Sequence, residues 1–215
     1  ATACDTDCLE MLEDKGLTWY ESSEIATRGF CSGCGASLFW KPAHGEYIAV
    51  MAGGDSGPYT FGLKAAARLA SMSNELAREL GGSLLISTSS RTAVEAVDLL
   101  EQRQTAPHYF YRWRANDKNN PYNGYLGVAD ALVVSADSIS MLSEACATGK
   151  PVYMFDPGAG SYAMRQPNNL SNSDNDFRFS ALLYKALMRW APPRLSRDLT
   201  LVHQRLIESH RAVWL

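Results

Sequence analysis

Residues 131–158 (ALVVSADSISMLSEACATGKPVYMFDPG) restrict the fold of this chain more than any other stretch. An apolar run (ALVVS) leads through a short polar segment (ADS) into a run with helical spacing, and a second apolar run (VYMFD) follows. This pattern predicts a strand–helix–strand unit of a parallel sheet. In such sheets, ligands bind beyond the carboxyl ends of the strands, and a hydroxyl-rich loop at a helix N-terminus favours phosphate.

The same alternation of apolar strands and amphipathic helices occupies most of the chain. We predict helices over about 60–80, 92–103, 139–149, 177–190 and 197–209, and strands over 47–52, 83–88, 108–113, 131–135 and 152–156. The predicted fold class is therefore α/β, with five parallel strands in the order 3-2-1-4-5. This order places a switch point between the first and fourth strands, so the loops 53–59 and 135–140 should face each other.

Composition separates the first residues from the rest and excludes several functional classes. Residues 1–46 hold four of the 5 cysteines and lack a long helical period, so we predict a small cysteine-rich β segment before an α/β domain at 47–215. A net charge of −3 gives no electrostatic footprint for nucleic acid. No apolar run reaches the roughly 18 residues of a membrane span, and the chain starts without a signal peptide, so we expect a cytoplasmic protein.

The loops after the first two predicted strands carry candidate phosphate-binding groups. Gly53, Gly54 and Gly57 would let backbone amides approach a ligand closely, and Ser56 could add a hydrogen bond. Arg91 follows the second strand and could pair with a phosphate. A tight strand-to-helix turn, and a surface arginine beside a helix cap, are equally plausible interpretations of these loops.

The loop after the fourth strand carries the strongest binding candidates. Asp137 or Ser138 suits the N-cap position of the following helix, and the hydroxyls and amides around Ser138 and Ser140 could cradle a diphosphate. Ser143 and Glu144 lie away from the apolar face of that helix, where Glu144 could accept hydrogen bonds from sugar hydroxyls. The structural alternative is a capped helix with an exposed glutamate.

The cysteines suggest a metal site in the first segment. Cys31 and Cys34 form a CxxC knuckle that supplies half of a structural zinc site, and Cys4 and Cys8 are the candidates for the other two ligands. Partial ligation and a disulfide or redox pair are the alternatives. Cys146 falls on an apolar helix face and is predicted to be a packing residue. No Ser–His–Asp or Cys–His pattern is visible, so the catalytic residues stay unknown.

Several motifs together resemble a bacterial family that is named after a plant mitochondrial-fission protein. They are GGDSGPYTF, GGSLLISTSSRT, YNGYLGVADALVVSADSISMLSEACATGKPVYMFDPG and the tail LIESHRAVWL. The resemblance implies a Rossmann-like nucleotide-sugar domain of the GT-B glycosyltransferase type (also described as a nucleoside-diphosphate-sugar epimerase), with the diphosphate on residues 138–140, Glu144 near the ribose and no required cofactor. It also implies an acceptor domain that about 46 residues cannot build, so a second domain or partner would complete catalysis.

The first segment resembles a different family. LTWYESSEIATRGFCSGCGASLFWKP is similar to the distal part of the glutathione-dependent formaldehyde-activating (Gfa-like) zinc family, whose CxxCG motif is matched by Cys31, Cys34 and Gly35. This resemblance implies an alternative function as a zinc-dependent carbon–sulfur lyase acting on a glutathione–formaldehyde adduct. A third hypothesis is a non-enzymatic scaffold or assembly module. The chain therefore resembles a fusion of two families, joined near the strand YIAVMAGG.

Overall fold

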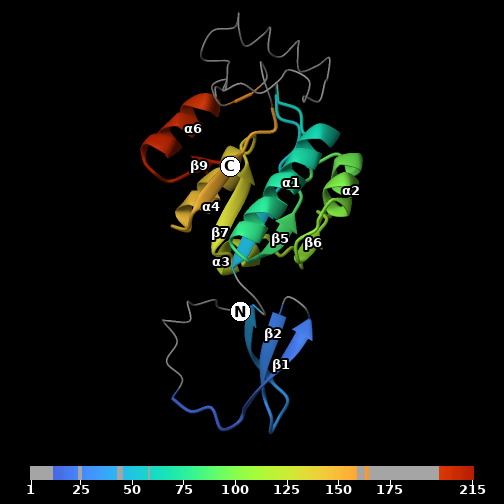
Figure 1. Cartoon of the computed structure of the whole chain (residues 1–215), viewed down its shortest axis with the longest axis vertical. Coiled ribbons are helices and arrows are strands. Elements are labelled where there is room, and N and C mark those ends of the chain that lie inside the picture. The colour runs from blue at the N-terminus through green and yellow to red at the C-terminus, as the bar shows by residue number, and fades with distance from the viewer. Residues whose placement is uncertain (1–11, 24–25, 43–45, 58, 159–162, 165–198) are drawn as a thin grey trace, which may run out of the picture.

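A computed structural model describes residues 12–23, 26–42, 46–57, 59–158, 163–164 and 199–215 of the chain (Figure 1). Within these residues the protein contains a small antiparallel sheet and a larger parallel sheet covered by helices. The small sheet consists of β1 (Leu17–Ser23), β2 (Ala26–Cys31) and β3 (Ser37–Pro42). The large sheet consists of β4 (Tyr47–Met51), β5 (Ser83–Ser87), β6 (His108–Tyr111), β7 (Ala131–Ser135), β8 (Val152–Phe155) and β9 (Val213–Trp214).

The large sheet has the strand order β6-β5-β4-β7-β8-β9, and every neighbouring pair is parallel. The predicted order 3-2-1-4-5 is confirmed for the five predicted strands. The prediction lacked β9, which adds a sixth strand beside β8. The switch point lies between β4 and β7, where Ile48 pairs with Ala131.

Side chains of β4 alternate between two hydrophobic layers, as a strand buried on both faces requires. Ile48 and Val50 pack in one layer with buried residues of α1 (Leu63–Glu79) and α2 (Val94–Gln102). Tyr47, Ala49 and Met51 pack in the other with α3 (Tyr122–Val128), α4 (Ile139–Ala147) and α6 (Leu199–Glu208). The sheet is therefore wound on both faces, which is the Rossmann-like arrangement that the sequence predicted.

Two of the helices test the sequence prediction further. α6 lies within the helix predicted at 197–209, whereas the helix predicted at 177–190 falls outside the described residues. α3 lies in a stretch for which no helix was predicted. Tyr125 of α3 is 6% exposed and supplies the apolar contact that fixes this short helix on the sheet.

Contacts between aromatic side chains hold the strands of the small sheet together. The rings of Trp19 and Phe39 stack with centroids 6.0 Å apart, and Tyr20 meets Phe30 edge-on at 5.5 Å. In Figure 1 this sheet lies below the large sheet, at the end where β4 begins. The loops that leave the carboxyl ends of β4 and β7 lie at the opposite end. The β content agrees with the predicted segment, while the domain boundary at residue 46 stays a prediction.

Candidate functional site

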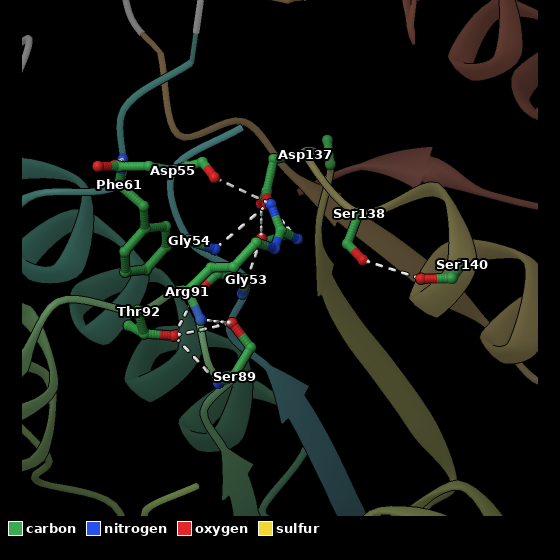
Figure 2. A network of polar contacts seen from close by, with 12 residues as sticks. Gly53, Gly54, Asp55, Phe61, Ser89, Arg91, Thr92, Asp137, Ser138 and Ser140 are labelled. Carbon is green, nitrogen blue, oxygen red and sulfur yellow. Dashed lines mark hydrogen bonds and ion pairs between the residues drawn. The ribbon is translucent and has the colours of Figure 1, made fainter. Parts of the chain in front are cut away.

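The loops after β4 and β7 meet at the switch point, as the strand order predicts (Figure 2). The amide of Gly53 donates to the hydroxyl of Ser135 over 3.0 Å, and the amide of Gly54 donates to Oδ2 of Asp137 over 3.2 Å. The Ser135 hydroxyl in turn donates to Oδ1 of Asp137. Both side chains are buried, so the two loops are joined by a closed polar network.

The two glycines at this junction are required by packing. A Cβ atom on Gly53 would overlap the carboxylate of Asp137 and the hydroxyl of Ser135, and one on Gly54 would overlap the backbone of Arg91. Their amides already donate to Ser135 and Asp137. This geometry corresponds to the tight-turn interpretation of the glycine loop.

The rest of the glycine loop forms a small turn of its own. The amide and carbonyl of Ser56 both bond to the backbone of Tyr59, over 2.9 and 3.1 Å. Gly57 within this turn has a φ of 58°, a left-handed conformation that glycine adopts without strain. Ser56 and Gly57 therefore lie beside the polar network, and Asp137 is in contact with Gly54, Ser135 and Arg91 instead.

Arg91 connects a third loop, after β5, to the same carboxylate. Its Nη2 lies 3.0 Å from Oδ2 of Asp137, and its Nη1 donates to the carbonyl of Asp55 over 3.1 Å. The turn that carries it is held by Ser89 and Thr92, whose hydroxyls bond to each other over 3.1 Å, while Thr92 also donates to the carbonyl of Gly53. The Arg91 side chain is 39% exposed and that of Asp137 is 0% exposed, so the arginine separates the carboxylate from solvent.

Asp137 is the electrostatic centre of this network. Burial raises the pKa of its carboxyl group above the ordinary value, and this effect outweighs the hydrogen bonds from Ser135 and Gly54 and the charge of Arg91, which lower it. Ionising a carboxyl group in this position costs free energy, because the charge is removed from water. The groups that donate to Asp137 act mainly to offset this cost of desolvation. Asp137 faces the interior and binds the loops together.

Ser138 and Ser140 lie at the start of α4, to the right of Asp137 and Arg91 in Figure 2. Ser138 is the N-cap residue, yet its side chain makes no capping hydrogen bond to the helix. Its hydroxyl lies 3.3 Å from that of Ser140 instead. The first turn of α4 therefore keeps amides that its own N-cap side chain does not satisfy, next to a pair of hydroxyls.

Ser143 and Glu144 lie on the exposed side of α4, as the helical spacing predicts. Oε2 of Glu144 accepts a hydrogen bond from the hydroxyl of Tyr122 over 2.6 Å. Burial, followed by this bond, raises the pKa of Tyr122, which keeps the phenol protonated as the donor. Sequence reasoning missed Tyr122 because no helix was predicted over Tyr122–Val128.

Sequence reasoning also missed three residues that position the site. Ser135 is the last residue of strand β7, and its hydroxyl accepts from the amide of Gly53. Asp55 lies in the loop after strand β4 and accepts a hydrogen bond from the amide of Phe61 over 2.8 Å. The signal for both residues was a polar side chain that follows a buried apolar run. Nε2 of His203, a residue of α6, lies 2.8 Å from the carbonyl oxygen of Ala136. The His203 ring also meets the ring of Trp214 edge-on, with the ring centroids 5.4 Å apart. No sequence pattern linked this distant histidine to the loop.

The β2–β3 hairpin carries the CxxC pair. Cys31 is partly buried and Cys34 is exposed, and neither forms a disulfide. Hydrogen bonds, first from the amide of Cys34, lower the pKa of Cys31. The other two predicted ligands, Cys4 and Cys8, lie outside the described residues, and within the described part no group of three or more potential ligands is placed to hold a metal ion. The zinc site stays a prediction.

Cys146 behaves as a packing residue of α4. Its side chain is partly buried against the layer that contains Leu142, and burial raises the pKa of its thiol. This agrees with the prediction from the apolar helix face. Among the helices of the described ranges, none combines the length and the apolar character that crossing a bilayer demands.

Comparison with known proteins matches most of the α/β part of the chain to one protein family. The family described as Mitochondrial fission ELM1 matches residues 37–173, a range that begins at β3 and extends beyond β8. "Mitochondrial fission protein ELM1" of Arabidopsis thaliana is 41% identical over 73 residues, which are 34% of this chain and 17% of that protein. "Uncharacterized protein RP120" of Rickettsia prowazekii (strain Madrid E) is 33% identical over 113 residues, 52% of this chain and 32% of that protein.

These matches cover less than a third of either relative's own length. None of them supports the resemblance of residues 17–42 to the Gfa-like zinc family. The match to the family covers more than half of this chain and includes the loops of the polar network. The chain belongs to the Mitochondrial fission ELM1 family.

Proposed function

We propose that this protein binds the diphosphate of a nucleotide or nucleotide-sugar at the carboxyl edge of β4, β5 and β7. The observation that carries the proposal is the convergence of three loops on Asp137, at the topological switch point of a parallel sheet. This convergence leaves the guanidinium of Arg91 and the hydroxyls of Ser138 and Ser140 at one edge of the sheet.

The contacts within the network indicate which groups would meet the phosphates. The amides of Gly53 and Gly54 already donate to buried acceptors, so they are poorly suited to a ligand. The amides of the first turn of α4 and the hydroxyls beside them remain suited, because an anion there gains from the helix dipole. Arg91 would add a charge-assisted hydrogen bond from its exposed side.

Glu144 is the candidate for binding the sugar or ribose. It lies one turn further along α4, on the exposed side, and the hydroxyl of Tyr122 holds one of its carboxylate oxygens at 2.6 Å. A ribose hydroxyl is a natural donor to a carboxylate that is fixed in this way. Tyr122 would act as the residue that orients Glu144.

Glycosyl transfer is the reaction that such a site would serve. The donors that bind the diphosphate would also stabilise it as the leaving group, with no cofactor needed for that step. The acceptor site would come from a further domain or a partner, in keeping with the greater length of the relatives. No residue of this chain is assigned as catalytic.

A binding experiment with the full chain tests the proposal. Thermal shift and calorimetry with UDP, GDP, ADP, CMP, their sugar conjugates and inorganic pyrophosphate should reveal at least one diphosphate that stabilises the protein. Replacing Ser138 and Ser140 together by alanine, or Arg91→Gln, should weaken that ligand about tenfold, which is roughly 1.4 kcal/mol.

Arg112→Gln is the matched control, because Arg112 is an exposed arginine that pairs with Asp98 on the surface. Equal affinity in the wild type and in the site variants would refute the assignment of the site. Absence of any diphosphate effect together with a defined oligomer in light scattering would favour the scaffold hypothesis instead.

A further inference from the structure

Arg91 is the cationic partner of a carboxylate that has no access to solvent (Figure 2). Its Nη2 lies 3.0 Å from Oδ2 of Asp137, whose side chain is fully buried. Its Nη1 donates to the carbonyl of Asp55 over 3.1 Å. Both terminal nitrogens of the guanidinium therefore already have acceptors within the protein, although part of the arginine side chain is exposed.

A phosphate that binds to Arg91 has to share this guanidinium with Asp137. Arginine binds phosphate most strongly through two parallel N–H groups, and each such pair includes at least one of the two terminal nitrogens. A phosphate in this geometry draws Arg91 away from the carboxylate and also brings negative charge close to it. Both changes favour the protonated form of a carboxyl group over the ionised form. The effect is large for a buried carboxylate, because a buried charge without its partner is strongly unfavourable.

The other charged side chains around Asp137 do not replace Arg91 as its counter-ion. Among the described residues, Arg91 is the one whose charge lowers the pKa of Asp137. The ionisable side chains on the surrounding elements contact the backbone instead: Asp55 the amide of Phe61, Asp156 the amides of Gly158 and Met164, Arg68 the carbonyls of residues 156–158, and His203 the carbonyl of Ala136. Histidine titrates near neutral pH, so an experiment has to separate His203 from Asp137.

We propose that a diphosphate ligand binds at this edge of the sheet together with one proton, which Asp137 takes from solvent as Arg91 turns to the phosphate. This inference rests on the proposed diphosphate site and adds its regulation by pH. Movement of Arg91 also gives water a path to the carboxylate, because the guanidinium separates that group from solvent in the free protein. The hydroxyl of Ser135 still donates to Oδ1 when the proton is on Oδ2, so the loops stay joined.

The sign of the pH dependence follows from the linkage between ligand and proton. The ligand raises the pKa of Asp137 further, so the complex binds a proton that the free protein has lost. Affinity is therefore highest at low pH. It falls as pH rises from the pKa of the free carboxyl to that of the complex, by at most about tenfold per pH unit. Because burial already raises the pKa of Asp137 in the free protein, this fall begins above the ordinary range of an aspartate.

The test is a calorimetric titration of the full chain with UDP-glucose, GDP-mannose and ADP-glucose, at steps from about pH 5 to about pH 8. These probes lack the ionisation at about pH 6 that a terminal phosphate has, so their own charge stays constant. Repeating each titration in buffers of different ionisation enthalpy gives the number of protons bound with the ligand. The wild type should take up as much as one proton per ligand, and its affinity should fall by about tenfold or more over the range.

Three variants assign the proton. Asp137→Asn should bind with no proton uptake and with an affinity that is independent of pH. Arg91→Gln should bind about tenfold more weakly than the wild type at low pH and take up fewer protons, because Asp137 without its counter-ion is already protonated in the free protein. Asp98→Asn is the matched control and should keep the full uptake, since Asp98 also pairs with an arginine, Arg112, over 2.6 Å but on the exposed surface.

Circular dichroism over the same pH range confirms that each variant is folded. Binding of a probe without proton uptake would overturn the coupling and leave the diphosphate site standing. The same conclusion follows if Asp137→Asn keeps the uptake, which would assign the proton to another group such as His203. If Asp137→Asn does not fold, Arg91→Gln decides, because full uptake in that variant would overturn the coupling. If none of the probes binds at any pH, the diphosphate site fails and the coupling fails with it.

Discussion

Replacing Asp137 with alanine removes the acceptor at the centre of the three-loop network. The hydroxyl of Ser135 and the amide of Gly54, both buried, would lose their partner. A buried donor without an acceptor costs about 1–3 kcal/mol. Arg91 is 39% exposed and can turn to water, so its ion pair adds only roughly 0–1 kcal/mol. The substitution also removes the desolvation cost of burying the Asp137 carboxylate, which offsets part of this sum. We therefore expect Asp137→Ala to lower the free energy of unfolding by about 2–4 kcal/mol.

Asp137→Asn separates the charge from the hydrogen bonds. Burial raises the folded-state pKa of Asp137 above its unfolded value, so the folded protein binds this proton more tightly than the unfolded chain does. The stability from this linkage is fully present below the unfolded pKa and is lost as pH rises through the folded pKa. The contribution of Asp137 to the stability of the wild type should therefore fall as pH rises from about 4, and the profile of Asp137→Asn should lack this fall.

Urea unfolding of the full chain, followed by circular dichroism at a series of pH values, measures both effects. Asp117→Asn is the control of opposite sign, because hydrogen bonds from the amide of Asn119 and from Tyr111 lower the pKa of that half-buried carboxyl. Its contribution is present above the unfolded pKa and lost as pH falls through the folded one. Parallel pH profiles for the wild type and Asp137→Asn would refute the reasoning, as would a loss under about 0.5 kcal/mol for Asp137→Ala.

Three further predictions concern single side chains and use the same unfolding assay. Gly53→Ala should lower the free energy of unfolding by more than about 2 kcal/mol, because the added Cβ would overlap the buried network. Gly124→Ala, at an open position of α3, should raise it by about 0.5–1 kcal/mol. Equal effects of the two substitutions would contradict the packing argument. Tyr122→Phe should cost about 0.5–1.5 kcal/mol through the lost bond to Glu144, and an unchanged midpoint would mean that water replaces that bond. Arg112→Gln should lower the free energy of unfolding by less than about 1 kcal/mol, since the ion pairs of Arg112 are exposed. A larger loss would mean that Arg112 stabilises the fold through contacts other than these ion pairs.

The sheet could be predicted because its central strands are continuous apolar runs separated by amphipathic helices. YIAVM, SLLIS and ALVVS are buried at every position, and chirality then leaves few possible orders. β9 has only two residues and forms because β8 offers an edge, which is a tertiary effect. α3 follows Pro121 within a run rich in Asn and Gly, so local propensity favoured a loop and packing of Tyr125 decided otherwise.

The location of the candidate site followed from topology, but its internal contacts did not. Strand order brought the loops of Gly53 and Asp137 together without any knowledge of side chains. Whether Asp137 faces solvent or the interior depends on its rotamer and on Ser135, neither of which leaves a pattern in the sequence. For the same reason the sequence could not show that the Gly53 and Gly54 amides donate inside the protein.

The amides of Gly53 and Gly54 also make the network visible to hydrogen–deuterium exchange. Loops usually exchange fast because they open locally, at little cost in free energy. Here the two amides donate to side chains at the end of β7 and in the loop after it, more than 80 positions away in sequence, and Arg91 of a third loop lies against Gly54. Releasing either amide requires the three loops to separate together, so these residues should exchange as slowly as the core strands. The carboxyl edge of the sheet would thus be as rigid as its centre.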